Sequence, residues 1–253
     1  MRLLNTNKIR ELLKSIDENL AVLSRMRPLT KGETERLRDE FLIEYTYNSN
    51  AIEGNTLTLR ETALVLEGIT IDKKPLKEHL EAIGHRDAFV YAEELAADRE
   101  SAMTEHTVKA LHSLVLIDRP ADKGVYRRIP VKIMGAYREP PQPYMIEPLM
   151  TELFINHAER KTRMHIIEAV ALFHLDFEGI HPFIDGNGRT GRLLMNLELI
   201  QNGYPAIDVK FTDRGRYYEA FDSYFKTNSP DKMTLLIAEY ADERLKRYLA
   251  ILE

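Results

Sequence analysis

The chain has 253 residues, of which 44% are hydrophobic and 30% charged, and it contains no cysteine. This composition is typical of one large globular domain or two small ones, and it excludes disulfides, thiolate catalysis and cysteine-based zinc sites. The net charge of −5 lacks the basic excess of a domain that binds nucleic-acid backbones, although a local basic patch is compatible with it. No apolar run approaches the roughly 18 residues of a membrane span, and the first residues do not resemble a signal peptide. We therefore expect a soluble, cytoplasmic protein without a membrane partner.

Hydrophobic residues recur at helical spacing over nearly the whole chain. Thr58 followed by Glu61 forms a capping-box pattern at the start of one predicted helix. Asn202-Gly203 with Pro205 stops another. The predicted helices cover about 3–20, 34–51, 58–66, 76–95, 104–119, 149–154, 164–177 and 189–201, with two more between 217 and 252.

One segment departs from this pattern. Residues 125–134 are rich in β-branched side chains, and Gly135 and three prolines at 140, 141 and 143 follow them. Such a run bounded by turn residues predicts a short β-hairpin or extended flap at about 125–145. The expected fold is therefore all-α, with one small β flap and an N-terminal helical region.

The stretch 181–192, HPFIDGNGRTGR, concentrates residues suited to phosphate chemistry. Gly186 and Gly188 come just before a predicted helix, whose first backbone N–H groups and positive dipole end favour an anion. Arg189 and Arg192 are three residues apart, so we expect both on one face of the first turn. The pattern predicts a site for a polyphosphate.

Asp185 would repel phosphates unless a divalent cation lies between them, which points to Mg²⁺. His181 could accept a proton from a hydroxyl that attacks phosphorus. Gly186, Gly188 and Gly191 also spell a dinucleotide-binding fingerprint. That fingerprint must follow a β-strand, however, and here a predicted helix precedes it.

Residues 181–192 resemble the signature of the Fic family, H-P-F-x-[DE]-G-N-G-R-x-x-R, at every specified position. Residues 174–177, 193–196 and the flap segment are also similar to Fic sequences, so the resemblance covers roughly 104–225. It implies a helical core that transfers AMP from ATP to a protein Ser, Thr or Tyr hydroxyl and releases pyrophosphate. The division that it implies is an N-terminal region at 1–103, a core at 104–206 and C-terminal helices at 207–253.

The resemblance also implies a role for each motif residue. His181 would be the catalytic base, Asp185 would hold Mg²⁺, and Arg192 would bind the γ-phosphate with Arg189 assisting. The flap would hold the target chain by strand addition. The full sets are Asp185, Gly186, Asn187, Gly188, Arg189, Thr190, Gly191, Arg192, Tyr217 and Tyr218 for the nucleotide and Val131, Lys132, Ile133 and Met134 for the target.

Ser49-Asn-Ala-Ile-Glu53-Gly54 resembles the inhibitory motif of the same family, [ST]-x-x-x-E-[GN]. Ser49 and Glu53 share one face of a helix of about 34–54, near its C-terminus. A carboxylate is unfavourable there, so Glu53 should have a cation nearby. By the resemblance that cation is Arg192, and the pairing would keep Arg192 from the γ-phosphate.

Several alternatives stay open. Within the same fold, the enzyme could remove AMP from a modified protein, with Glu53 aligning a water molecule. Transfer of phosphate or phosphocholine is less favoured, because the motif keeps Gly188 and both arginines. Core packing explains one of the Tyr217-Tyr218 pair as well as contact with adenine does. A non-catalytic regulator that binds nucleotide or DNA has little support, whereas a homodimer and self-modification are compatible with the sequence.

Overall fold

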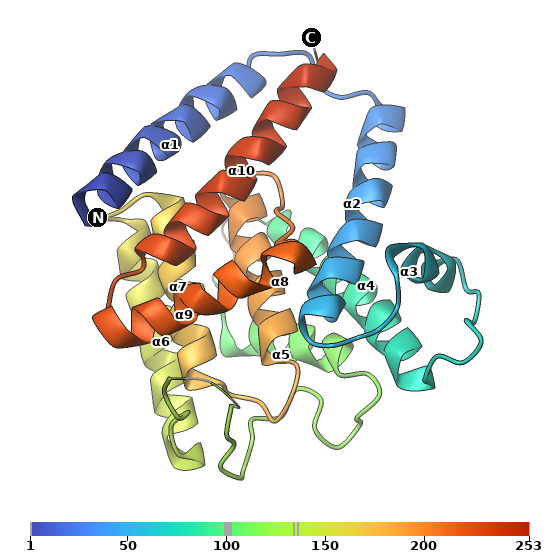
Figure 1. The fold of residues 1–253 in the computed structure, drawn as a ribbon. Helices are drawn as coiled ribbons and strands as arrows, with labels where there is room; N and C mark the ends of the chain where they lie inside the picture. The colour runs from blue at the N-terminus through green and yellow to red at the C-terminus, as the bar shows by residue number, and fades with distance from the viewer. Residues whose placement is uncertain (1, 99–102, 134, 136, 253) are drawn as a thin grey trace.

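The computed structural model describes residues 2–98, 103–133, 135 and 137–252. Within these ranges the regular structure is helical, which confirms the predicted all-α class (Figure 1). None of the described helices is long and apolar enough to cross a membrane. The α-helices are α1 Arg2–Leu23, α2 Lys31–Ile52, α3 Leu59–Leu66, α4 Leu76–Ala96, α5 Glu105–Val115, α6 Ile146–Lys161, α7 Ile166–Ile180, α8 Asn187–Gln201, α9 Arg214–Thr227 and α10 Asp231–Leu252, with 3₁₀ turns η1 Pro143–Met145 and η2 Phe211–Asp213.

Capping boxes set where two of the N-terminal helices begin. Thr58 accepts a hydrogen bond from Glu61 N–H and caps α3, as predicted. The same device at Thr30 and Glu33 starts α2 at residue 31, three residues earlier than the hydrophobic spacing indicated. The extra turn is stable because the Thr30 and Glu33 backbone N–H groups both find hydrogen-bond acceptors within it.

Helices α7 and α8 lie at the centre of the molecule. Nearly every residue of α8 is buried. One apolar cluster joins α7 and α8 to the parallel pair α1 and α10, and a second joins them to α2, α4, α5 and α6 (Figure 1). Because both clusters share these two helices, the turn between α7 and α8 is held from both sides.

The predicted β-hairpin at 125–145 is wrong: the described residues of this segment contain no strand. Pro130, Pro140 and Pro141 cannot donate to a strand ladder, which leaves a hairpin with too few partners. Instead, Arg127 fixes the segment. Its N–H donates to Pro182 O at 2.9 Å, and its buried guanidinium donates to His181 O at 2.8 Å and to Pro141 O at 2.6 Å. The flap is therefore an irregular strap tied to the turn after α7.

Candidate active site

The turn between α7 and α8 has a defined backbone shape. His181 ends α7 in the left-handed region at φ 51°, and Gly186 precedes α8 at φ 75°. The side chain of Asn187 bonds Phe183 twice, accepting from its N–H at 2.9 Å and donating to its C=O at 3.0 Å. Asn187 therefore fixes the loop that carries His181 and Asp185.

A residue that sequence reasoning missed, His112 on α5, braces the same loop. Its ring stacks on Phe183 with centroids 3.6 Å apart, Nδ1 accepts from Gly124 N–H at 2.8 Å, and Nε2 donates to Asp185 O at 2.9 Å. Burial lowers the pKa of His112 to about 4, so the neutral imidazole is the form present near neutrality. In the sequence His112 is one residue of an amphipathic helix, with nothing to mark it as a brace.

Arg192 is the central cation of the site, and only 1% of its surface is exposed. Its guanidinium donates from Nε to Ser49 Oγ at 2.9 Å and from Nη2 to both Ser49 O and Glu53 Oε1 at 2.8 Å. Nη1 donates to Tyr217 Oη at 3.3 Å. Burial disfavours the charge, but the Tyr217 and Glu53 oxygens outweigh it, so the pKa of Arg192 is raised.

The Glu53 carboxylate lies against the first turn of α8. Glu53 follows the last residue of α2. Its carboxylate oxygen occupies the space where a Cβ at Gly188 would lie. The first amides of α8 point to this end of the helix, because intrahelical bonding starts only with Thr190 N–H to Gly186 O. The Glu53 anion therefore lies where a helix N-terminus favours negative charge.

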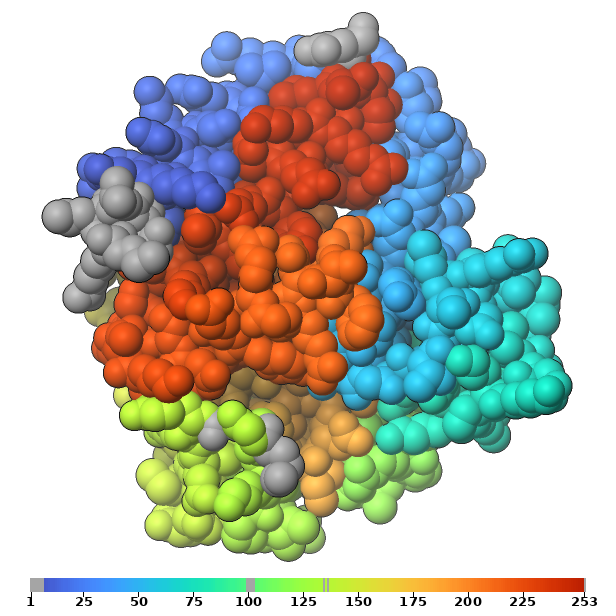
Figure 2. Space-filling view, in the orientation of Figure 1, coloured from blue at the N-terminus to red at the C-terminus, as the bar shows by residue number. Residues whose placement is uncertain are grey.

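A cavity of about 620 Å³ opens beside these groups. That volume is in the range of small-molecule sites. In the space-filling view, α9 in orange lies next to the yellow-green strap, and both contribute to the cavity (Figure 2). The lining side chains come from α2, the strap, α7, α8 and α9, and they include Glu53, Ile133, Glu178, His181, Arg192, Arg214, Tyr217, Tyr218 and Asp222.

The two tyrosines of α9 occupy different environments. Tyr217 is buried, and its hydroxyl hydrogen-bonds His174 Nε2 at 2.7 Å as well as Arg192. Tyr218 is 41% exposed and stacks with the Arg214 guanidinium, 5.2 Å from its ring centroid. Tyr218 thus offers an open aromatic face, whereas the Tyr217 hydroxyl is committed to Arg192.

Arg189 and Arg192 point in different directions, although their spacing suggested a common one. Arg189 is buried against α4, with Nη1 3.3 Å from Glu81 Oε1 and Nη2 3.5 Å from Asp185 Oδ1. Neither Arg189 nor Asp185 is among the residues that line the 620 Å³ cavity. The turn therefore presents Arg192 to the cavity and uses Arg189 to anchor the loop.

Asp185 is the residue that the sequence predicts to hold Mg²⁺. Its Oδ2 lies 3.3 Å from Arg119 and its Oδ1 accepts Gly186 N–H at 2.6 Å. Burial would raise the pKa of Asp185, but Arg189 and the Gly186 N–H outweigh it and lower the pKa, so the carboxylate is charged. No cluster of three or more His, Asp or Glu that could hold a metal occurs among the described residues. One carboxylate fits Mg²⁺ only where phosphate oxygens and water supply the other ligands.

The remaining predicted residues are distributed as follows. Thr190 is fully buried, and Gly191 packs against His174 and Glu178. Of the target-binding set, Ile133 lines the cavity, Val131 is half-buried, and Lys132 is exposed 3.6 Å from Glu139. Met134 lies outside the described residues.

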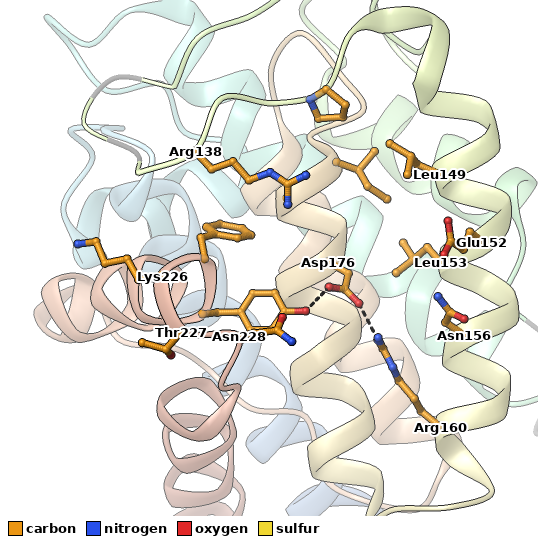
Figure 3. Close-up of a pocket in the computed structure, with 15 residues that line it drawn as sticks. Arg138, Leu149, Glu152, Leu153, Asn156, Arg160, Asp176, Lys226, Thr227 and Asn228 are labelled. Carbon is orange, nitrogen blue, oxygen red and sulfur yellow. Dashed lines mark hydrogen bonds and ion pairs between the residues drawn. The ribbon is translucent and has the colours of Figure 1, made fainter. Parts of the chain in front are cut away.

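A second cavity, of about 580 Å³, lies between α6 and α9 along α7 (Figure 3). Asp176 of α7 holds its wall together, since it accepts from Arg160 at 2.6 Å and from the Tyr224 hydroxyl at 2.6 Å. None of the predicted site residues lines this cavity.

Comparison with known proteins agrees with this geometry. Residues 102–199 match the Fic/DOC family. The chain therefore contains a Fic domain.

Relatives and solved structures extend the similarity over most of the chain. It is 35% identical over 209 residues to "Protein adenylyltransferase Fic" of Culex quinquefasciatus and 34% identical over 212 residues to the protein of that name from Nematostella vectensis. The matches cover 81% and 83% of this chain but 41% and 49% of those proteins. A Fic domain-containing signaling protein from Bacteroides thetaiotaomicron has a TM-score of 0.81 and 28% identity, covering 95% of each chain. Fic-1 from C. elegans has a TM-score of 0.85 and 25% identity, covering 99% of this chain and 73% of that one.

Proposed function

We propose that this chain is a Mg²⁺-dependent protein adenylyltransferase that transfers AMP from ATP to a Ser, Thr or Tyr hydroxyl of a target protein. The observation that carries the proposal is one cavity in which His181, the N-terminus of α8 and the Arg192 guanidinium meet. The names of the relatives with about 35% identity support it. Because the chain spans less than half of those proteins, activity, substrate and target are proposed here from the residues that the chain itself contains.

In this proposal the phosphates of ATP bind at the N-terminal end of α8. Gly188 has no side chain there, so the phosphates can come close to the backbone. His181 takes the proton of the target hydroxyl while the hydroxyl oxygen forms a bond to the α-phosphorus. The bond from the α-phosphorus to its bridging oxygen breaks, and pyrophosphate leaves. Mg²⁺ held by Asp185 would neutralise phosphate charge. Tyr218 provides a face for the adenine ring, and Ile133 places the strap beside the incoming target.

We further propose that Glu53 inhibits this reaction. Its carboxylate lies at the end of α8, where the γ-phosphate would bind, and it pairs with Arg192 at 2.8 Å. While that pair persists, the guanidinium is directed at Ser49 and Glu53 and away from ATP. In this proposal each of the three regions contributes a different part of the site. Residues 1–103 contribute the inhibitory Glu53 after α2, residues 104–206 contribute the reacting groups of α7 and α8, and residues 207–253 contribute the tyrosines of α9.

Glu53→Gly should raise AMP transfer and self-modification. A charge-assisted hydrogen bond contributes about 1.5–3 kcal/mol, which is about ten- to a hundred-fold in rate. The test is incubation with Mg²⁺ and ATP labelled at the α-phosphate or, separately, at the γ-phosphate, followed by measurement of labelled protein. Glu67→Gly is a matched control, because Glu67 also follows the last residue of a helix and precedes a glycine with positive φ. Equal rates for Glu53→Gly and the parent would remove Glu53 as an inhibitor, and label from the γ-phosphate would contradict AMP transfer.

His181→Ala in the Glu53→Gly background should abolish transfer and leave ATP binding largely intact, since the imidazole is proposed to act on the target hydroxyl. Chelation of Mg²⁺ should also stop the reaction. ATP affinity measured by calorimetry, beside transfer measured by label, separates the two roles. A fully active His181→Ala would rule out the base assignment.

Removal of AMP is the second candidate, because the Glu53 carboxylate is 34% exposed in the cavity that His181 also lines, where it could align water. AMP-modified protein supplied to the parent enzyme tests it. Loss of label that requires Glu53 would favour removal over transfer. The cytoplasmic location and a homodimer remain predictions.

A further inference from the structure

We propose that Glu178, in the last turn of α7, positions the His181 imidazole for proton transfer. This inference rests on the proposed function, because the role of His181 as the base does. It concerns a residue outside the 181–192 signature, and no motif in the sequence pointed to it.

Glu178 and His181 are neighbours across the end of α7. Glu178 Oε2 lies 3.6 Å from His181 Nδ1, and the side chains are 13% and 20% exposed. It is the one carboxylate within ion-pair distance of His181 among the residues that the structure describes. Both residues line the 620 Å³ cavity.

Two polar atoms of this pair make no hydrogen bond within the described residues. His181 Nδ1 and Glu178 Oε1 are both buried, and neither has a hydrogen-bond partner within the described part of the chain. An unpaired buried polar atom is costly, so a small rotation that closes the 3.6 Å gap is favourable. Hydrogen bonds between catalytic groups are often long before substrate binds and shorten in the complex.

The neighbouring helix leaves room for this carboxylate. A Cβ at Gly191 of α8 would lie 2.8 Å from Glu178 Oε1 and 2.8 Å from the His174 ring. Any larger side chain at position 191 would press Glu178 away from its present place. Because Gly191 has no side chain, the Glu178 carboxylate can lie against α8.

Other carboxylates near the turn are already engaged, and Asp222, which also lines the cavity, lies beyond ion-pair distance of the His181 ring. Glu53 pairs with Arg192, and Asp185 is held by Arg119, Arg189 and Gly186 N–H. On the strap side, the Arg127 guanidinium contacts His181 only through its main-chain oxygen. On the α9 side, Tyr217 is bonded to Arg192 and His174. Glu178 is therefore the group available to the His181 ring.

The chemical consequence concerns the tautomer of His181. A carboxylate that accepts from Nδ1–H leaves the lone pair on Nε2, at the opposite side of the ring, to take the hydroxyl proton. Once that proton is bound, the same carboxylate stabilises the imidazolium. Glu178 is thus a positioning residue, which acts on the reaction through His181.

Glu178→Ala in the Glu53→Gly background tests this role. We expect kcat to fall about ten- to a hundred-fold, the effect of one charge-assisted hydrogen bond, with the KM for ATP unchanged. Nitrogen-15 chemical shifts of the ring, recorded at alkaline pH, should show the His181 proton redistributed between Nδ1 and Nε2. Loss of signals in His181→Ala assigns them. Glu178→Gln should give a smaller shift and an intermediate kcat, because its amide oxygen can still accept from Nδ1–H.

Asp176→Ala is the matched control on the same helix. It removes a carboxylate that holds Arg160 and Tyr224 in the second cavity (Figure 3). This control should lower the unfolding temperature and leave the His181 signals unchanged. Unchanged His181 signals in Glu178→Ala would overturn the proposal, even if activity falls. If Glu53→Gly itself transfers no AMP, the proposed function fails, while the ring signals still report on the pair.

Discussion

A single arginine connects the two halves of the sequence. Arg192 of α8 is buried, and three of its hydrogen bonds run to Ser49 and Glu53 of the α2 end, more than a hundred residues earlier in the chain. A buried guanidinium is stable only where its donors are satisfied. Any ligand that competes for Arg192 must therefore replace several bonds at once.

Ser49→Ala should raise AMP transfer less than Glu53→Gly does. The change removes the Oγ acceptor of Arg192 Nε and keeps Ser49 O and Glu53 as partners. One hydrogen bond contributes about 1 kcal/mol, so we expect an increase of about threefold to tenfold in the initial rate. Thr46→Val is the control, because the Thr46 hydroxyl, on the same helix, is buried and has no partner within the described residues. A rate equal to that of the parent would show that Ser49 does not hold Arg192 in its inhibited position.

At the scale of elements, the strap depends on one side chain. Arg127 joins four carbonyl groups of the strap and the α7 end, at Ile129, Pro141, Ile180 and His181. Arg127→Lys keeps the charge but cannot bridge them, since an ammonium lacks the planar fork of a guanidinium. We expect a loss of about 1–3 kcal/mol in the free energy of unfolding and faster tryptic cleavage at the exposed Arg128 and Lys132. Arg138→Lys is the matched control on the same segment. Cleavage and stability like those of the parent would contradict the anchoring role.

The sequence predicted the helices well, because apolar spacing and capping residues act locally. For the same reason it predicted that a turn at 181–192 precedes a helix, since the glycines and the apolar residues after them follow each other along the chain. The strap was predicted wrongly, because its own Arg127 bonds carbonyl groups of the strap and of the turn after α7, and these contacts replace the pairing of two strands. The different directions of Arg189 and Arg192, and the parts that His112 and Glu178 take, depend on which helices pack around α8. No spacing within one segment encodes that packing.

At the scale of the whole molecule, several histidines are buried on the helices that pack around α8. His85, His112 and His174 are almost completely buried, on α4, α5 and α7 respectively. Burial lowers the pKa of all three, to about 4 for His112 and about 3 for His174. The two core clusters therefore meet around imidazoles that must be neutral in the folded protein.

The protein should lose stability as the pH falls from about 6.5 to about 4. In this window the unfolded chain binds protons at histidines, whose ordinary pKa is 6.5, and the folded chain does not. The stabilisation is therefore complete above pH 6.5 and decreases on acidification, by an amount on the order of 3 kcal/mol for His112 alone. Asp185, whose pKa is lowered in the folded protein, adds a loss of the same sign at the acid end of this window and below it. Urea unfolding at several pH values measures the slope, and His112→Gln should reduce it, because an amide can accept from Gly124 N–H and donate to Asp185 O without titrating. A free energy of unfolding that stays constant across the window would mean that the folded protein takes up these protons, and the loop would then be braced by something other than a neutral His112.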